Sequence, residues 1–266
     1  MLLKKYSYYF YSFYEMITGF QPWLPVSLAF LKGQVPSGST IQLRQASLKF
    51  KVRTLMDIWT VKETFLDRFY ERYGTVIGDS WSVIDIGGGI GDFTIFVAAQ
   101  HPDNVVYTFE PTPESFALLE ANLQLNRLSN VRVYPQAVWS SRGEVVMDTT
   151  PSEPGSYTSK FHNAPCESTN KLLIVPSLSL QDVFDLIGLA NCHLLKIDCE
   201  GAEYPILFGA PEPVFNRIER IIMEYHDYVD GYSHQELVDF LKRQGYAVKT
   251  YSNFVHANLG YLYAAR

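Results

Sequence analysis

The chain has 266 residues, of which 47% are hydrophobic and 19% charged, and its formal net charge is −6. This composition is typical of a globular protein of one or two domains and excludes wholesale disorder. Residues 1–60 carry a net charge of +5 and the remaining chain −11, which excludes a uniformly basic nucleic-acid-binding protein because most of the chain would repel phosphate.

The first 59 residues form a basic, aromatic extension. Nine aromatic side chains lie between Tyr6 and Trp23, but no apolar run reaches the roughly 18 to 20 residues of a transmembrane helix. Lys4 and Lys5 resemble the start of a secretion signal, yet no small-residue cleavage site follows, so we expect a cytoplasmic protein. Three cysteines without metal-ligand spacing are typical of reduced thiols. Residues 22–39 are rich in Pro and Gly and predict a loop-dominated connector.

A helix is predicted from Thr60, because Thr60 and Glu63 have the capping-box spacing and apolar residues recur at helical intervals as far as Gly74. Short apolar runs then alternate with helical patterns. Strands bounded by helices imply parallel crossover units, which predicts an open α/β sheet covered on both faces. The expected strands are Ser82–Ile86, Val105–Phe109 and Val131–Tyr134, and the helices between them are Asp92–Gln100 and Pro113–Asn126.

The second half of the chain is less regular at first. Glu144–Asp148 predicts an additional strand, and Pro151–Asn170 predicts a long loop that we interpret as a functional lid, with disorder as the alternative. The alternation then resumes and ends in a hairpin-like pair of strands. Its helices are expected at Leu180–Ile187, Ala202–Phe208 and Ser233–Gln244, and its strands at His193–Ile197, Ile218–Glu224, Tyr246–Tyr251 and Leu259–Tyr263.

The segment from Val83 to Asp92 runs from a buried strand through four glycines into a helix. Glycines allow a tight turn and a close approach of the backbone to a ligand, and a helix N-terminus favours a negative group. A turn without a ligand explains the pattern less well, because four glycines in five residues cost much backbone entropy. We therefore predict a nucleotide-like ligand at Gly87, Gly89 and Gly91.

Two carboxylates indicate which ligand binds. Asp85, at the end of the strand, suits a ligand with a cationic ammonium group, and Glu110 is placed to accept hydrogen bonds from both hydroxyls of a ribose. A dinucleotide fingerprint counted from Gly87 would need its third glycine where Asp92 stands. The pattern therefore favours S-adenosylmethionine over NAD.

A second acidic cluster, from Asp198 to Glu203, follows a later strand at the same edge of the sheet. Ligands of open α/β sheets lie at the carboxyl ends of the strands, so Asp198 is predicted to face the cofactor and Glu200 or Glu203 the acceptor. Without a ligand, Asp198 would merely cap the next helix and Glu203 would complement its dipole.

His226 follows Glu224 at the end of another strand and is a candidate general base toward a hydroxyl, although a lone histidine is more often structural. Together with Asp198 and Glu200, these two residues offer oxygen and nitrogen ligands for a hard divalent cation. Their spacing is not diagnostic of a metal site, and we predict no metal.

Three segments together resemble the FkbM-type methyltransferases: residues 83–91, Phe109-Glu110-Pro111 and residues 195–203. The third is the more specific, because the first two occur throughout class I methyltransferases. The resemblance covers roughly Thr60 to His226. It implies a seven-stranded, mostly parallel Rossmann-like domain that uses S-adenosylmethionine to methylate a hydroxyl of a sugar, glycan or natural product.

The resemblance also implies roles for individual residues. Cys199 stands where such segments often have an aliphatic residue, which is a departure of little consequence. Asp198 would lie beside the methionine end of the cofactor. The cofactor would be held by Asp85, Gly87, Gly89, Gly91 and Glu110, with Gln136, Ala137 and Val138 near the adenine.

Methyl transfer to a hydroxyl needs a base, because a neutral alcohol is a poor nucleophile. Our order of candidates for the catalytic base is His226, Glu200 and then Glu203. A non-enzymatic binding module that retains the cofactor fold is one alternative, and the intact cluster at Asp198 argues against it. An NAD-linked oxidoreductase is another, disfavoured by Asp92.

We therefore expect residues 60–266 to form the catalytic domain and residues 1–59 a helical or irregular extension outside the family resemblance. The extension has three open roles beside simple packing: a cap over the acceptor site, a contact in a homodimer, or a peripheral membrane contact through residues 1–30. The expected partner is a small-molecule or glycan hydroxyl acceptor and not nucleic acid.

Overall fold

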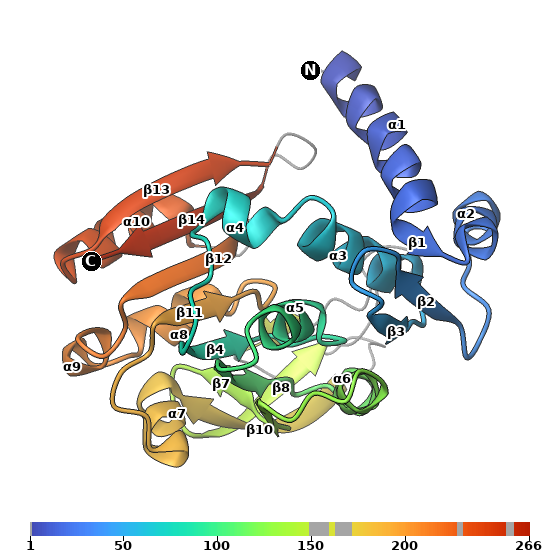
Figure 1. Ribbon diagram of the computed structural model, residues 1–266. Coiled ribbons are helices and arrows are strands. Elements are labelled where there is room, and N and C mark those ends of the chain that lie inside the picture. The colour runs from blue at the N-terminus through green and yellow to red at the C-terminus, as the bar shows by residue number, and fades with distance from the viewer. Residues whose placement is uncertain (1, 149–159, 163–171, 228–230, 254–257) are drawn as a thin grey trace.

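The computed structural model describes residues 2–148, 160–162, 172–227, 231–253 and 258–266 (Figure 1). Most of the predicted lid, 151–170, lies outside the described residues, as does Cys166. Within the described part of the lid, residues 160–162 form a short strand, β9 (Lys160–His162).

The main sheet has seven strands in the order β13-β14-β12-β11-β4-β5-β6, and only β14 pairs antiparallel to its neighbours. The predicted seven-stranded, mostly parallel sheet is thus confirmed. The two last strands pair antiparallel, as the hairpin-like ending predicted. The strands span β4 Ser82–Ile86, β5 Val105–Phe109, β6 Val131–Tyr134, β11 Leu194–Ile197, β12 Arg220–His226, β13 Ala247–Ser252 and β14 Leu259–Ala265.

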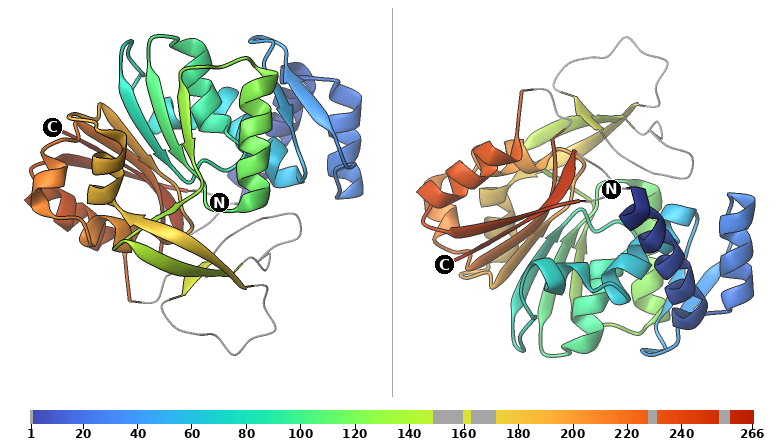
Figure 2. Two further views of the ribbon diagram at one scale, coloured as in Figure 1. Left: turned by 90° about the horizontal axis from the view of Figure 1, so that it is seen from below. Right: turned by 90° about the horizontal axis from the view of Figure 1, so that it is seen from above.

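Helices cover both faces of this sheet (Figure 2). On one face, α7, α8 and α10 pack over β11 and β12 in an apolar core. On the other, α3, α5 and α6 pack over β4, β5 and β6. The helices span α3 Leu55–Phe65, α4 Phe69–Tyr73, α5 Asp92–Gln100, α6 Pro113–Leu125, α7 Leu180–Ile187, α8 Glu203–Phe208, α9 Glu212–Phe215 and α10 His234–Arg243.

A second sheet of four strands, β7-β10-β8-β9, lies beside the main one. The sequence predicts β8 (Gly143–Asp148) to within one residue, but it does not predict β7 (Ala137–Trp139) or β10 (Leu172–Ser179). β10 pairs antiparallel with β8 and parallel with β7, so this sheet links the segment after β6 to the segment before α7.

The N-terminal segment is more regular than its composition predicts. It forms α1 (Leu2–Gly19), β1 (Phe20–Gln21), α2 (Trp23–Lys32), β2 (Thr40–Leu43) and β3 (Lys49–Lys51), and α1 projects from the body of the molecule (Figure 1). The prediction of a loop over residues 22–39 is wrong, because an apolar run from Trp23 forms a helix that ends at Gly33 in the left-handed conformation.

The N-terminal segment is joined to the catalytic part through α3. The predicted cap at Thr60 is wrong. The capping box is formed by Thr54 and Asp57, six residues earlier in the chain, and Thr60 lies within the helix. The expected boundary between residues 59 and 60 therefore falls inside α3. The buried ammonium of Lys62, on α3, pairs with Glu15 of α1 at 3.1 Å and with Asp67, just after α3, at 2.6 Å.

The exposed surface of α1 and α2 is unusually apolar. Phe10 is 80% exposed and Leu31 75%, and neighbouring aromatic and leucine side chains are exposed as well. None of the helices within the described ranges combines the length and apolar run that crossing a bilayer requires. A membrane contact or a dimer contact through this surface stays a prediction.

Candidate active site

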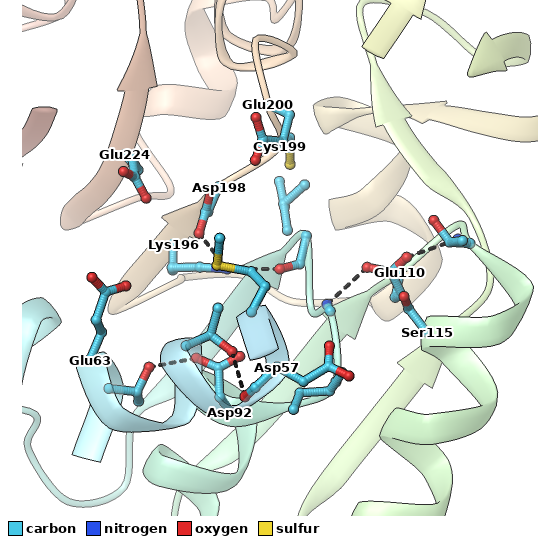
Figure 3. A pocket seen from close by; sticks show the side chains of 18 of the residues that line it. Asp57, Glu63, Asp92, Glu110, Ser115, Lys196, Asp198, Cys199, Glu200 and Glu224 are labelled. Carbon is cyan, nitrogen blue, oxygen red and sulfur yellow. Dashed lines mark hydrogen bonds and ion pairs between the residues drawn. The ribbon is translucent and has the colours of Figure 1, made fainter. Parts of the chain in front are cut away.

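A cavity of about 310 Å³ opens where the parallel strands β4, β5, β11 and β12 end (Figure 3). Residues just after these strands line one side, and the first turns of α3 line the other. This is the edge at which open α/β sheets bind ligands. Arg53, Met56 and Trp59 belong to this wall, so part of the segment that lies outside the family resemblance borders the cavity.

The glycine loop between β4 and α5 approaches the strand end closely. Gly87 has φ +82°, and a Cβ there would lie 1.9 Å from the carbonyl oxygen of Asp198. Gly89 has φ +54° and borders the cavity, but a Cβ at Gly89 would meet no atom within 4 Å. The loop therefore packs tightly against the protein at Gly87 and faces an open space at Gly89, which is the arrangement expected of a backbone that a ligand approaches.

Glu110 is the buried carboxylate that follows β5. One of its oxygens accepts a hydrogen bond from the Gly89 amide at 2.8 Å, and the other accepts one from the Thr112 amide at 2.9 Å. Burial raises the pKa of Glu110, and these two backbone donors oppose the shift. The Thr112 hydroxyl is a third donor to Glu110, and a carboxylate has about four acceptor positions, so about one remains for a hydroxyl group in the cavity. This fits the predicted contact with a ribose.

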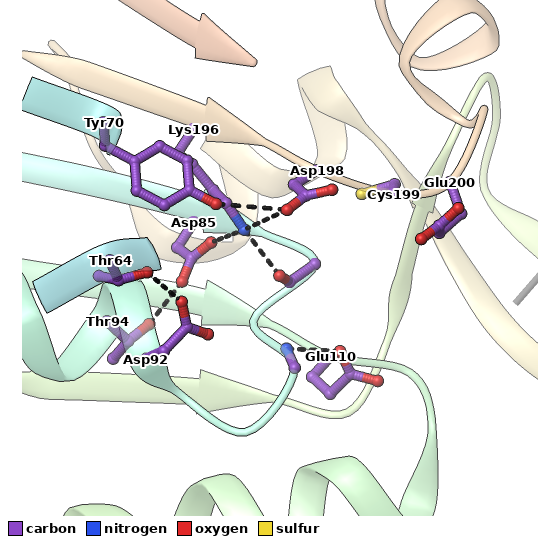
Figure 4. A network of polar contacts seen from close by, with 12 residues as sticks. Thr64, Tyr70, Asp85, Asp92, Thr94, Glu110, Lys196, Asp198, Cys199 and Glu200 are labelled. Atoms are coloured by element: carbon purple, nitrogen blue, oxygen red, sulfur yellow. Dashed lines mark hydrogen bonds and ion pairs between the residues drawn. The ribbon is translucent and has the colours of Figure 1, made fainter. Parts of the chain in front are cut away.

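Asp85 lies deeper than the sequence predicts. It is fully buried, does not line the cavity, and accepts a hydrogen bond from Thr94 at 2.6 Å. Its other oxygen lies 3.0 Å from Nζ of Lys196, a residue of β11 (Figure 4). Lys196 lines the cavity whereas Asp85 does not, so a contact between Asp85 and the cofactor stays a prediction.

Asp198 borders the cavity, and its side chain is 28% exposed, whereas Asp85 is fully buried. The hydroxyl of Tyr70, from α4, donates to its Oδ2 at 3.3 Å. Burial and the Asp198 charge raise the pKa of Tyr70 well above its ordinary value, so this phenol stays a donor. Asp198 is thus held in place while it faces the cavity.

The three candidate bases lie close together, but only two of them border the cavity. Glu203 is fully buried outside the cavity lining, and its Oε1 lies 3.1 Å from Nδ1 of His226 and 2.9 Å from the Cys199 amide that donates to it. His226 and Glu200 both border the cavity, with 3.6 Å between Nε2 and Oε2. Glu200 has φ +52°, an uncommon conformation for a residue with a side chain.

The environment of His226 favours the protonated form of its ring. Burial lowers the pKa of His226, but the charges of Glu203 and Glu200 outweigh this and raise it to about 10. The ring is therefore protonated at neutral pH and pairs with these two carboxylates. The order of candidate bases stays a prediction; in this geometry the His226 ring lies between Glu203 and Glu200, which favour its protonated form.

Two further carboxylates line the cavity: Glu224, which the sequence offers only as a possible ligand of a divalent cation, and Glu63, which the sequence does not single out as a site residue. Burial and the Asp198 charge raise the pKa of Glu224, on β12, well above its ordinary value, and no residue in the described ranges donates a hydrogen bond to it. Burial also raises the pKa of Glu63, on α3, to about 8, although the Trp59 indole donates to it at 2.8 Å. The spacing of Glu63 and Glu224 in the chain gives no sign that they meet.

The remaining expected residues divide between the cavity and its support. Ala137 and Val138 line the cavity, as expected of residues near the adenine, whereas Gln136 and Gly91 do not. Gly91 begins α5 with φ +89°. Within the part of the chain that the structure describes, the Oε1 atom of Gln136 is buried without a hydrogen-bond donor.

One set of side chains among the described residues has the spacing of a metal site. Asp198, Glu224 and His226 each offer a ligand atom, and these atoms lie within 4.8 Å of one another. A metal binds a neutral imidazole, so a cation here would have to displace the proton that Glu200 and Glu203 favour on His226. The expectation that no metal binds stays a prediction.

Residues 85–248 match the family model described as the methyltransferase FkbM domain. The chain is 31% identical over 213 residues to the 31-O-demethyl-FK506 methyltransferase FkbM of Streptomyces tacrolimicus, a match that covers 70% of this chain and 80% of the relative. It is 25% identical over 202 residues to Methyltransferase 1 of Beauveria bassiana, with the same coverages.

A solved structure, the methyltransferase FkbM from Methylobacillus flagellatus, has a similar fold. It is 14% identical, its TM-score is 0.50, and the match covers 91% of this chain and 58% of that chain. At this identity the likeness concerns the fold alone.

Proposed function

The chain belongs to the FkbM family of methyltransferases, and from this membership we propose that it methylates a hydroxyl oxygen of a sugar, glycan or other natural product. It is an S-adenosylmethionine-dependent methyltransferase, so the alternatives of a non-enzymatic module and an NAD-linked oxidoreductase fall away. The name of the Streptomyces relative, which specifies a 31-O-demethyl compound, supports oxygen as the acceptor atom.

Two features of the cavity suit S-adenosylmethionine. No protein atom lies within 4 Å of where a Cβ would stand at Gly89, and Glu110 beside it keeps about one acceptor position for a hydroxyl group. We propose that Glu110 binds the ribose hydroxyls, that Ala137 and Val138 contact the adenine, and that Asp198 faces the amino-acid end. When bound, S-adenosylmethionine supplies a methyl group on a sulfonium, which is an electrophile.

We propose Glu224 as the base that takes the proton of the acceptor hydroxyl. The observation that carries this proposal is geometric: Glu224 lines the cavity, none of the described residues donates a hydrogen bond to it, and one of its carboxylate oxygens lies within 4.8 Å of ligand atoms of Asp198 and His226. A general base must be ionised, and the positive charge of His226 lowers the pKa of Glu224 against the rise that burial causes. Two charged neighbours act on Glu224 in opposite senses: the His226 cation lowers its pKa, and the Glu200 carboxylate raises it.

The wall formed by α3 supports a role for the N-terminal segment in acceptor binding. Met56, Trp59 and Glu63 border the cavity opposite the strand ends. Of the open roles for this segment, we propose that its last part caps the acceptor site. Positioning of the acceptor and exclusion of water then account for much of the catalysis.

The test uses methyl-labelled S-adenosylmethionine and an extract of the source cells, with the labelled product separated and identified. Wild-type protein should label a hydroxyl-bearing compound, and Glu224→Gln should slow labelling at least about tenfold while it binds S-adenosylhomocysteine as tightly. Glu219→Gln, the same change at an exposed site before β12, is the matched control and should label at the wild-type rate. An unchanged rate for Glu224→Gln would remove Glu224 as the base.

A further inference from the structure

Lys196 joins three parts of the cavity floor through one buried ammonium group (Figure 4). Its Nζ lies 3.0 Å from Oδ1 of Asp85, donates to the Gly87 carbonyl at 2.8 Å, and lies 4.0 Å from Oδ2 of Asp198. The side chain is only 3% exposed. The end of β4, the glycine loop and the residue after β11 therefore share one cation.

We propose that Lys196 is a positioning residue that fixes the Gly87 carbonyl and the Asp198 carboxylate in the orientation that holds the amino-acid end of the cofactor. This role rests on the proposed function, and in particular on the placement of that end beside Asp198. Nothing in the family match assigns a role to Lys196.

The register of the sheet explains why the ammonium lies there. Lys196 of β11 is directly opposite Asp85 of β4 in the parallel pairing, and both strands are buried. A buried ammonium is stable only when it is paired and hydrogen-bonded. Asp85 holds it from below, and the second oxygen of Asp85 is occupied by the Thr94 hydroxyl. Asp85 can therefore influence the cofactor through Lys196.

Lys196 remains charged in this environment. Burial lowers the pKa of Lys196, but the charges of Asp85 and Asp198 outweigh burial and raise it above its ordinary value. Asp92, at the start of α5, adds a further negative charge in the same sense. The ammonium thus keeps all three of its donors at any pH at which the protein is assayed.

Gly87 and Asp198 are also coupled to each other. The amide of Asp198 donates to the Ile86 carbonyl at 3.1 Å, and the space for a Cβ at Gly87 is taken by the Asp198 carbonyl oxygen. A displacement of the glycine loop would therefore displace Asp198 as well. By contrast, Glu110 takes its two backbone hydrogen bonds from Gly89 and Thr112, at the ribose end.

This division predicts that Lys196 affects only ligands with an amino-acid end. The probes are S-adenosylhomocysteine and methylthioadenosine, which share adenosine and sulfur but differ in that end. In calorimetric titrations, Lys196→Met should weaken S-adenosylhomocysteine about tenfold or more, because the contacts at stake involve charged groups. Binding of methylthioadenosine should stay within about twofold of wild type, since its contacts are at Glu110 and the adenine.

Two further variants keep the test independent of folding. Lys196→Met alone leaves Asp85 as an unpaired buried charge, so the double variant Asp85→Asn/Lys196→Met removes the pair together and should show the same selective loss. Thr94→Val is the matched control: it removes the other partner of Asp85 and leaves Lys196 in place. Its ratio of affinities for the two ligands should equal that of wild type.

A double-mutant cycle that combines Lys196→Met with Asp198→Asn tests whether Lys196 affects S-adenosylhomocysteine binding through Asp198. If Lys196 acts through Asp198, the loss caused by Lys196→Met should be smaller in the Asp198→Asn background. Equal losses for the two ligands would show that Lys196 merely supports the loop, and unchanged S-adenosylhomocysteine binding would also overturn the proposal. A wild-type protein that binds neither ligand would refute the cofactor site itself, which separates that failure from this one.

Discussion

Gly89→Ala separates ligand binding from folding more cleanly than any other change in the glycine loop. The added methyl group would meet no protein atom within 4 Å and would point into the cavity beside Glu110. Alanine at φ +54° costs about 1–2 kcal/mol of stability. If the cofactor fills the cavity here, the methyl group overpacks the complex by about 1–3 kcal/mol, which weakens binding roughly 5- to 150-fold.

Calorimetric titration of S-adenosylhomocysteine measures this loss, and thermal unfolding of the free protein measures the backbone cost. Gly33→Ala is the matched control, because Gly33 ends α2 with φ +70°, also has no atom within 4 Å of a Cβ, and does not line the cavity. Both variants should lose similar stability, but only Gly89→Ala should lose affinity. Wild-type affinity in Gly89→Ala would refute the placement of the cofactor along this loop.

Four other predictions follow from the cavity. Glu110→Gln should weaken S-adenosylhomocysteine about tenfold or more in calorimetry, because a carboxylate accepts ribose hydroxyls more strongly than an amide does; equal affinity would contradict the ribose contact. His226 has a pKa raised from 6.5 to about 10, so its contribution to stability is complete below pH 6.5 and is lost as the pH rises through about 10. The free energy of unfolding, measured with denaturant, should therefore fall more steeply with pH over this range for wild type than for His226→Gln. Equal dependence on pH in the two proteins would refute the ion pairs. Met56→Ala should raise the KM for the acceptor and leave S-adenosylhomocysteine affinity unchanged, whereas the reverse pattern would exclude a capping role for α3. A chelator should leave the rate of methyl transfer unchanged, and a loss that magnesium restores would show that a cation binds beside His226.

Local patterns predict the catalytic fold well. The strands β4, β5 and β6 and the helices α5 and α7 have the predicted bounds, because each is a short run with clear turn or cap residues at both ends. The sequence predicts the N-terminal segment only as a helical or irregular extension and gives no bounds for its helices, since aromatic residues on nearly every side of α1 hide its helical period and Pro22 suggests a loop. The true cap of α3 at Thr54 competes with an equally good pattern at Thr60, and only packing distinguishes them.

The site is predictable where chemistry follows a strand end, and not where it depends on pairing across the sheet. Glu110 and Asp198 are in the cavity because each comes directly after a parallel strand. The depth of Asp85 depends on Lys196, which faces it from a strand more than a hundred residues later in the chain, and no local pattern reveals that register. The protonation of His226 likewise depends on two carboxylates that the fold brings together.

The most direct test of methyl transfer to oxygen is the chemical identity of the methylated product. S-adenosylmethionine with a carbon-13 methyl group should be incubated with wild-type protein and cell extract, and the labelled product examined by NMR. The labelled carbon should have the chemical shift of a methyl ether, and at a cofactor concentration below the wild-type Kd the Gly89→Ala reaction should form it roughly 5- to 150-fold more slowly. A label on nitrogen or carbon would contradict the proposed reaction, and equal labelling by Gly89→Ala would contradict the proposed cavity.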